Sequence, residues 1–137
     1  MILPEKYPFI PVNPTFANAT LMPYLPIVFS IGEKSLRTSA LLDTGSMTSV
    51  LPYSVGLQLG AIWDQQTFRV PLVGGLKGVD ARYLELIATV GSFVPVRLAF
   101  AWAQTDLMPV ILGQTNFFMQ FTVCFDRSKS IFEIRPA

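Results

Sequence analysis

The segment 41–46, Leu-Leu-Asp-Thr-Gly-Ser, combines residue types that could carry out a hydrolysis: a carboxylate, hydroxyl groups and a glycine. Asp43 follows the apolar run 40–42 and precedes the run 47–51, so an acidic side chain stands between two segments with the composition of buried strands. Burial of a carboxylate costs free energy unless something compensates for it. An ordinary turn, in which Asp43 bonds only its own backbone, is the alternative interpretation. The position between two core strands favours a functional carboxylate.

The residue types that the chain lacks exclude much of enzyme chemistry. There is no histidine, which removes every mechanism with an imidazole base and the usual zinc sites. Cys124 is the single cysteine, which excludes an intramolecular disulfide and a thiolate metal site, and we interpret it as a small strand residue. We therefore expect no metal and no cofactor. Carboxylate chemistry remains, because Ser46 and Lys34 or Lys77 have no sequence context that joins them into a Ser-Lys pair.

The composition indicates one apolar domain. The chain has 137 residues, of which 51% are hydrophobic and 14% charged, and its net charge is +1. This length suits one compact domain, so a second functional half must come from another molecule. Lys and Arg are scattered, and we therefore expect no nucleic-acid partner. The longest apolar stretches, 21–31 and 92–103, are interrupted by proline and arginine and fall short of a membrane span.

The N-terminal segment differs in composition from the rest of the chain. Residues 1–19 contain four prolines and lack the uninterrupted apolar core of a secretory signal. We therefore divide the chain into a proline-rich N-terminal arm, residues 1–23, and a domain of residues 24–137. Cytoplasmic residence is the default expectation.

Apolar and β-branched runs separated by turn residues predict an all-β domain. Helical turns are expected at 52–59 and 114–120. The runs 68–73 and 79–90 would form a long hairpin with a glycine-rich tip, and the last two strands would form a final hairpin. The predicted strands are 24–31, 36–42, 48–51, 68–73, 79–90, 93–102, 109–112, 121–125 and 131–134.

Three segments together resemble the retropepsin-like aspartic peptidases, in the form found in cellular and bacterial members. Segment 40–46 is similar to the active-site signature of that family, 73–79 to its glycine-rich flap, and 110–113 to its apolar-apolar-Gly motif. The order and spacing of these segments also agree, over about residues 24–134. The resemblance implies a closed acid-protease-like β-barrel with a flap hairpin and one short C-terminal helix.

One aspartate of this kind implies two chains. Hydrolysis of a peptide bond without a metal or a covalent intermediate needs one carboxylate that takes a proton from water and a second acid that protonates the substrate carbonyl. Two adjacent carboxyl groups do not both ionise easily, so they share a proton. The other aspartates lack a following Thr-Gly or Ser-Gly, and the second carboxylate is therefore expected from Asp43 of another copy, in a homodimer with a two-fold axis through the site. Those other aspartates are Asp64, Asp80, Asp106 and Asp126.

The resemblance also implies roles for individual residues. Asp43 would be the catalytic carboxylate, Thr44 would bond across the two loops, and Gly45 would let the backbone approach. Ser46 would donate to the Asp43 carboxylate and favour its ionised form. An extended, partly apolar polypeptide would bind as an added strand beneath the glycine-rich tip. The residues expected to bind substrate are Ser46, Val73, Gly74, Gly75, Leu76 and Gly78.

A peptide-binding or dimerisation domain with the same fold but without catalysis is the main alternative. The intact Asp43, Thr44 and Gly45 favour the peptidase, since a binding module has little use for a buried acid pair. Release of the domain from a larger protein is a third alternative, which the proline-rich start permits. Residues 132–136 have the pattern of a hairpin end rather than of a dedicated interface strand, so the mode of dimerisation stays open.

Overall fold

The computed structural model describes residues 2–12 and 20–137, and within them no helix is long and apolar enough to cross a membrane. The strands are β1 (Glu5–Pro8), β2 (Ile10–Pro11), β3 (Leu21–Met22), β4 (Tyr24–Ile31), β5 (Lys34–Leu42), β6 (Val50–Leu51), β7 (Ala81–Thr89), β8 (Val96–Ala103), β9 (Val110–Leu112), β10 (Phe121–Asp126) and β11 (Ile131–Pro136). The helices are α1 (Tyr53–Gln58) and α2 (Phe117–Gln120), with 3-10 turns η1 (Trp63–Gln65) and η2 (Gly74–Leu76).

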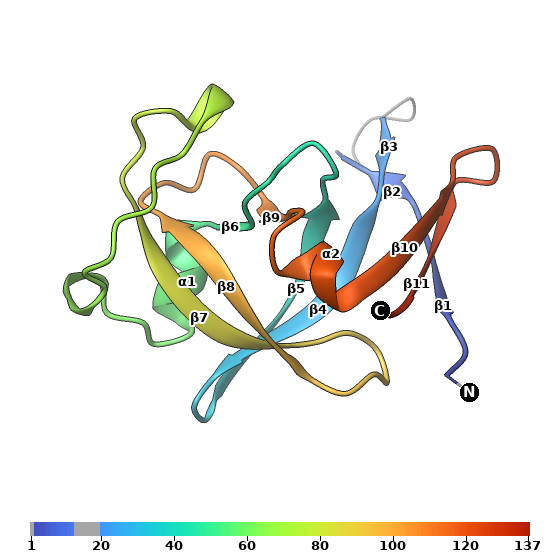
Figure 1. The fold of residues 1–137 in the computed structure, drawn as a ribbon, viewed down its shortest axis with the longest axis horizontal. Coiled ribbons are helices and arrows are strands. Elements are labelled where there is room, and N and C mark those ends of the chain that lie inside the picture. Colours follow the sequence, from blue (N-terminus) through green and yellow to red (C-terminus); the bar gives the residue numbers. More distant parts are fainter. Residues whose placement is uncertain (1, 13–19) are drawn as a thin grey trace.

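Six strands close into a barrel in the order β4-β5-β9-β6-β8-β7 (Figure 1). β4 and β5 form an antiparallel hairpin across a turn in which Gly32 has a φ of 57°. The other long antiparallel ladder, β7 with β8, runs from Ala81 opposite Ala103 to Ala88 opposite Val96. Closure pairs the strands around the ring, so the core is enclosed without free edges. The predicted all-β class with a closed barrel is confirmed.

β9 joins segments that are far apart in the sequence. It pairs in parallel with β5, with Ala40 opposite Val110 and Leu42 opposite Leu112, and it pairs antiparallel with β6 on its other side. β6 in turn pairs in parallel with β8. The end of β5, where Asp43 follows, therefore lies beside the end of β9.

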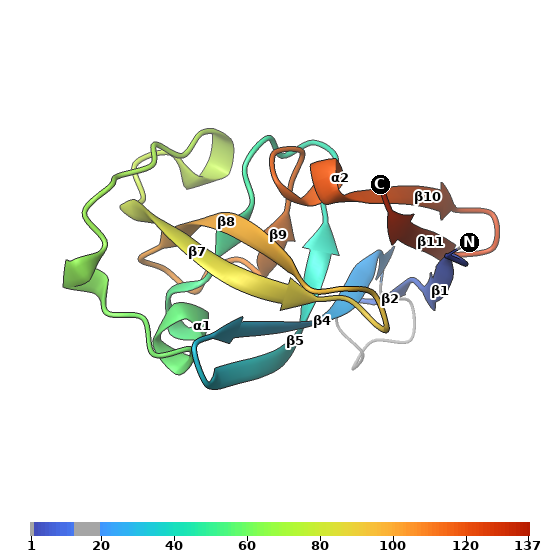
Figure 2. The same cartoon turned by 60° about the horizontal axis from the view of Figure 1, so that its bottom comes forward.

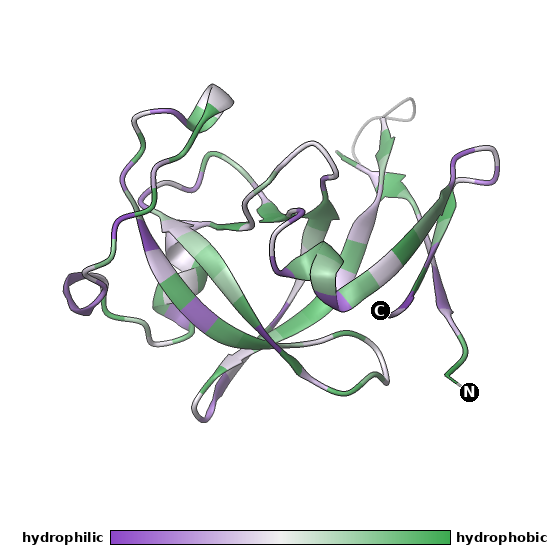
Figure 3. Cartoon of the chain, in the orientation of Figure 1, coloured by the Kyte–Doolittle hydropathy of each residue, from purple (hydrophilic) through white to green (hydrophobic). Residues whose placement is uncertain are grey.

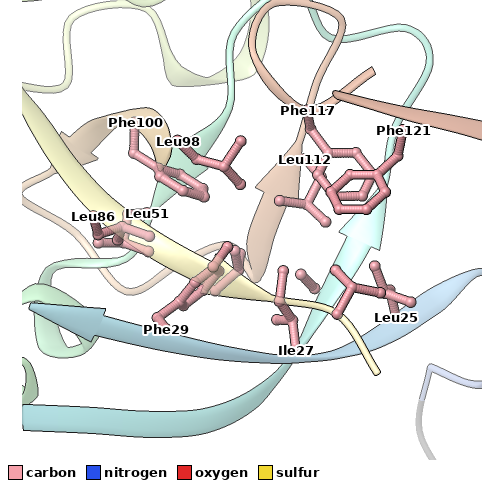
Figure 4. Packing of buried hydrophobic residues seen from close by; sticks show 14 of the residues in the cluster. Leu25, Ile27, Phe29, Leu51, Leu86, Leu98, Phe100, Leu112, Phe117 and Phe121 are labelled. Atoms are coloured by element: carbon pink, nitrogen blue, oxygen red, sulfur yellow. The ribbon is translucent and has the colours of Figure 1, made fainter. Parts of the chain in front are cut away.

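The barrel interior is filled by side chains that alternate along the strands. Leu25, Ile27 and Phe29 of β4 are buried, as the period of two in a strand requires. The rings of Phe29 and Phe100 pack edge to face at 5.4 Å, and Leu112 of β9 lies in the same cluster (Figure 4). Hydrophobic and hydrophilic bands also alternate along β7 (Figure 3). Complete burial of one such large side chain contributes about 1.5–3 kcal/mol.

A second sheet, in the order β1-β11-β10, brings both ends of the chain together (Figure 2). β1 pairs antiparallel with β11, with Glu5 opposite Ile134, and β10 pairs with β11 as the expected final hairpin. Phe132 and Ile134 of β11 are buried under this sheet. The N-terminal arm is extended at β1, where it forms part of the sheet, while its residues 1 and 13–19 lie outside the described residues.

An aromatic cluster attaches α1 to the barrel wall. The ring of Tyr53 stacks on Trp102 at 5.6 Å, and Trp63 meets Trp102 edge-on at 5.0 Å. A Cβ atom on Gly56 would overlap the Trp102 indole, so the helix approaches this ring only because it has a glycine there. The guanidinium of Arg82 lies 4.3 Å from the centre of the Trp63 ring, a cation–π contact that ties β7 to the same cluster.

The expected strand 68–73 is not a continuous strand. It faces β7 through a single bridge, Arg69 opposite Arg82, and the chain then winds into the 3-10 turn η2. Pro71 has no N–H to add to a ladder, which explains why the pairing ends there. We call residues 68–80 the glycine-rich arm.

The expected helix at 114–120 begins later than predicted. α2 comprises only Phe117–Gln120, because Asn116 has a φ of 72° and this left-handed conformation interrupts a right-handed helix. The residues before Asn116 contact the loop after β5 instead.

Candidate active site

Asp43 stands at the rim of the barrel, where β5 ends beside β9. Its backbone N–H donates to the carbonyl oxygen of Leu112 at 3.0 Å, one step beyond the parallel ladder of the two strands. Its side chain is half-buried, whereas Thr44 and Gly45 are exposed. The carboxylate is thus fixed by the core on one side and accessible from outside on the other.

The residues after Asp43 form a tight turn around its carboxylate. The N–H of Gly45 donates to Oδ1 of Asp43 at 3.0 Å, and the N–H of Ser46 donates to the Asp43 carbonyl at 3.2 Å. A Cβ atom on Gly45 would lie 3.3 Å from the same Oδ1, which is tighter than ordinary contact. Within the described residues Oδ2 accepts no hydrogen bond. One oxygen is therefore oriented by the backbone, and the other is available to a ligand.

Ser46 supports the loop rather than the carboxylate in the single chain. Its Oγ donates to the carbonyl oxygen of Thr48 at 2.6 Å, and the expected donation to Asp43 is not made. The hydroxyl thereby stabilises the path of the chain from the turn toward β6.

The residues directly after β9 hold the other side of the turn. The N–H of Gln114 donates to the carbonyl oxygen of Ser46 at 2.8 Å. A Cβ atom on Gly113 would lie 2.7 Å from that same carbonyl oxygen, so the two segments approach each other only because residue 113 is glycine. The apolar-apolar-Gly segment 110–113 is therefore a structural support of the Asp43 turn.

Ser49 is a buried polar residue that the sequence alone did not single out. It is 2% exposed, and its Oγ accepts a hydrogen bond from the N–H of Gly113 at 3.0 Å. The same oxygen lies 3.5 Å from the carbonyl oxygen of Thr115, to which the hydroxyl donates. These bonds satisfy polar groups that would otherwise be buried without a partner. The available signal was a hydroxyl residue directly before the buried pair Val50 and Leu51.

Gln114 is a second residue that the sequence alone did not identify. Its side-chain Nε2 donates to the carbonyl oxygen of Thr44 at 2.7 Å, across 70 positions of sequence. Its place directly after the apolar-apolar-Gly segment was a signal, but we interpreted that place as the beginning of a helix. Side-chain contacts at such a separation follow from the register of β5 and β9 and cannot be inferred from local pattern.

A cleft of about 600 Å³ lies between the Asp43 turn and the glycine-rich arm. We call it the Asp43 cleft. It brings the predicted carboxylate together with most of the residues expected to bind substrate, whereas Thr44 and Gly78 do not line it. Its lining consists of Asp43, Gly45, Ser46, Met47, Thr48, Val50, Ile111 and the arm residues Pro71, Leu72, Val73, Gly74, Gly75 and Leu76.

The walls of the Asp43 cleft are mainly apolar. Val50 and Leu72 are buried and belong to a small hydrophobic cluster. Ile111 and Leu76 pack against that cluster. Among the described residues that line the cleft, Asp43 is the sole ionisable side chain. The described part of the chain also holds no group of three or more metal-ligating side chains. In surroundings of low polarity, a carboxylate interacts strongly with any charge or proton donor that a ligand brings.

A second hollow, of about 610 Å³, lies against the terminal sheet, with Phe93 and Phe121 in its lining. Its carboxylate, Glu5, is already engaged, since it accepts hydrogen bonds from Ser92 Oγ at 2.6 Å and from the Tyr7 hydroxyl at 2.7 Å. These two bonds, that of Ser92 first, lower the pKa of Glu5. Both carboxylate oxygens are thus used within the fold, which makes the Asp43 cleft the better candidate for chemistry.

No protein-family model matches the sequence, and no curated protein matches it. Solved structures do match the fold. A retropepsin-like aspartic protease from Rickettsia conorii superposes with a TM-score of 0.61 at 14% identity, over 98% of this chain and 94% of that one. The EIAV protease complexed with the inhibitor HBY-793 superposes with a TM-score of 0.50 at 20% identity, over 72% of this chain and 86% of that one.

These likenesses concern the fold, since the identities are low. They agree with the closed six-stranded barrel and the short helices described above. The likeness to the Rickettsia protein also extends over nearly the whole of both chains. The chain therefore has the retropepsin-like fold.

Proposed function

We propose that the chain is one subunit of an aspartic endopeptidase, with Asp43 as its catalytic carboxylate. The observation that carries this proposal is that an Asp-Thr-Gly turn and a glycine-rich arm border a single cleft within a retropepsin-like fold. The matched structures from Rickettsia conorii and EIAV are both proteases, which supports the same class of reaction here.

Two Asp43 carboxyl groups, one from each subunit, would activate a water molecule between them. The ionised carboxylate takes a proton from water while the water oxygen attacks the carbonyl carbon of the substrate, and the protonated carboxyl gives its proton to the carbonyl oxygen. The tetrahedral intermediate then collapses and the C–N bond breaks. The leaving nitrogen takes the proton that the first carboxylate accepted from water, and the second carboxylate recovers its proton from a hydroxyl of the intermediate. The Gly45 N–H on Oδ1 supports this role, because it fixes the orientation of the carboxylate.

The second carboxylate must come from another chain. No other aspartate lines the Asp43 cleft within the described residues, and Asp106, for example, accepts a hydrogen bond from the N–H of Ser54 at 2.9 Å. In a closed dimer the same surface of each subunit meets at a two-fold axis. The exposure of Thr44 and Gly45 supports such an arrangement, because these residues are open to contact by a partner turn.

An extended polypeptide is the proposed substrate. The apolar walls of the Asp43 cleft suit apolar side chains, and the peptide would bind beneath the glycine-rich arm as an added strand. Gly74 and Gly78 have φ values of 66° and 89°, so the arm reverses direction at positions where most residues would be strained. We assign substrate binding to Ser46 and to the arm residues Val73, Gly74, Gly75, Leu76 and Gly78.

A peptide-binding domain without catalysis is the second candidate. It is favoured by one observation: the hydrogen bond from Gly45 to Asp43 is also what an ordinary Asp turn makes. The two candidates differ in whether peptides are cut or only bound.

Replacement of Asp43 by Asn tests the proposal. The change keeps the size of the side chain and removes the proton acceptor, so we expect cleavage of a peptide library at mildly acidic pH to fall by about 10²- to 10⁴-fold. Products are identified by mass spectrometry. Asp64→Asn is the matched control, because Asp64 is exposed in η1 and lies outside the cleft.

Mixing of subunits tests the dimer. Wild-type chain refolded with an excess of Asp43→Asn chain is expected to lose more activity than dilution explains, since mixed dimers have only one carboxylate. Full activity of Asp43→Asn, or an active species with the mass of one chain, would overturn the proposal. Peptide binding without any product from the wild type would support the silent domain.

A further inference from the structure

Gln114 contacts the Asp43 turn twice. Its backbone N–H donates to the carbonyl oxygen of Ser46 at 2.8 Å, and its side-chain Nε2 donates to the carbonyl oxygen of Thr44 at 2.7 Å. The first bond is a backbone bond that most residue types would make at this position. The second requires a side chain with a donor at the reach of glutamine.

The bond to Thr44 fixes a residue that makes no other hydrogen bond within the described residues. Thr44 is exposed, and it follows β5 without taking part in the ladder to β9. Within the described residues neither its N–H nor its Oγ1 makes a hydrogen bond. Gln114 therefore holds Thr44 by its carbonyl and leaves the amide and the hydroxyl unengaged.

We infer that, in the dimeric peptidase proposed above, Gln114 is a positioning residue that orients Thr44 for contact with the partner subunit. An exposed turn that must meet its own copy at a two-fold axis benefits from being ordered beforehand, since ordering at the moment of association weakens binding. The Thr44 carbonyl is engaged with Gln114 before association, so the residue presents its free N–H and hydroxyl in one orientation. Gln114 does not line the Asp43 cleft, and its effect on catalysis passes through Thr44.

Gln114→Met tests the inference in the full-length chain. Methionine has nearly the same length and lacks the donor, so the hydrogen bond is lost while the backbone bond to Ser46 remains possible. We expect the dimer dissociation constant, measured by sedimentation, to rise about three- to tenfold, the factor that one neutral hydrogen bond represents. At protein concentrations that keep the variant dimeric, KM should stay within about twofold of wild type, because the cleft walls are unchanged.

Amide hydrogen exchange provides a readout that does not depend on activity. The N–H of Gly45, which donates to Asp43, should exchange faster in Gln114→Met, while the N–H groups of the β7–β8 ladder keep their protection. Gln114→Glu should act in the same direction and more strongly, since it places a carboxylate oxygen against the Thr44 carbonyl. Gln58→Met is the control, because Gln58 is exposed at the end of α1 and lies outside the cleft.

The outcomes separate this inference from the proposed function. If the wild type is active and dimeric but Gln114→Met changes neither the dissociation constant nor the exchange at Gly45, the positioning role is wrong. If the wild type is monomeric and cuts no peptide, the proposed function fails and the role of Gln114 in dimerisation fails with it, whatever the exchange shows. A general loss of protection in the variant, extending to β7 and β8, would make Gln114 a residue of overall stability and would also overturn the inference.

Discussion

Gly113 lies directly against Ser46, at a distance that no other residue type permits. A Cβ atom on Gly113 would stand 2.7 Å from the carbonyl oxygen of Ser46. We predict that Gly113→Ala lowers the free energy of unfolding by about 1–3 kcal/mol, as overpacking does, and moves the Asp43 turn. Urea unfolding followed by circular dichroism measures the first effect, and loss of peptide cleavage reports the second.

Gly75→Ala is the matched control for that variant. A Cβ atom on Gly75 would have no heavy atom within 4 Å, and its φ is not in the left-handed region. Its stability should equal that of the wild type. Equal stability of Gly113→Ala would show that the turn and the segment after β9 move apart without cost.

Ser49→Ala should destabilise the same region by a different route. The variant leaves the buried N–H of Gly113 without its acceptor at 3.0 Å, and such a loss costs about 1–3 kcal/mol. Thermal unfolding by calorimetry measures it. Ser39→Ala, at an exposed position of β5, should have no comparable effect. A variant of Ser49 as stable as that control would mean that water or another group replaces the hydroxyl.

The N-terminal strand should make stability depend on pH. Hydrogen bonds from Ser92 and then from Tyr7 lower the pKa of Glu5, so the folded state favours the ionised form. A carboxyl group of this kind adds stability above its unfolded pKa, and that stability is lost as the pH falls through the folded pKa. We therefore expect Glu5→Gln to be less stable than the wild type in urea at pH 7, and the difference to shrink near pH 3.

Tyr7 contributes to folding stability at neutral pH and loses this contribution only at alkaline pH. Burial, and then the bond to Glu5, raise its pKa to about 12, so the neutral phenol is the folded form and its contribution is lost only as the pH rises toward that value. Between pH 3 and pH 7 the difference between Glu5→Gln and wild type therefore reports on Glu5. Glu33→Gln, in the exposed β4–β5 turn, is the control. A difference for Glu5→Gln that stays constant over this range would contradict the prediction.

Gly78→Ala should impair the glycine-rich arm with little effect on the barrel. Gly78 has a φ of 89°, and an alanine there is strained by about 1–2 kcal/mol. Because the arm is exposed and paired to β7 by a single bridge, we expect it to adopt another path. The result should be a lower kcat/KM for peptide cleavage at nearly unchanged unfolding free energy. Lys77→Ala, in the same arm but outside the lining of the Asp43 cleft, should cleave like the wild type.

The barrel could be predicted from the sequence because its strands have strong local patterns. The predicted strand 24–31 coincides with β4, and 36–42 lies within β5, since buried residues alternate along both. The place of Asp43 at the end of β5 and the turn at Gly45 also follow from local sequence. Local patterns therefore located the carboxylate and the strand that carries it.

The contacts that complete the site could not be predicted in this way. Gln114 reaches Thr44, and Ser49 reaches Gly113, only after β9 has entered the barrel in a particular register. The path of the glycine-rich arm was also mispredicted, because apolar residues in 68–73 resemble a strand although the arm leaves β7 at Pro71. Such features depend on tertiary pairing, which overrides local propensity.

The parallel pairing of β5 with β9 has a consequence for the order in which the protein is made. β9 lies 70 positions after β5, and a growing polypeptide that has not reached residue 110 lacks the strand that separates β5 from β6. Contacts of such long sequence separation form late in folding. The N–H of Asp43 finds its acceptor on Leu112 only then. A ribosome-bound chain therefore carries no assembled carboxylate turn until residue 112 has left the ribosome.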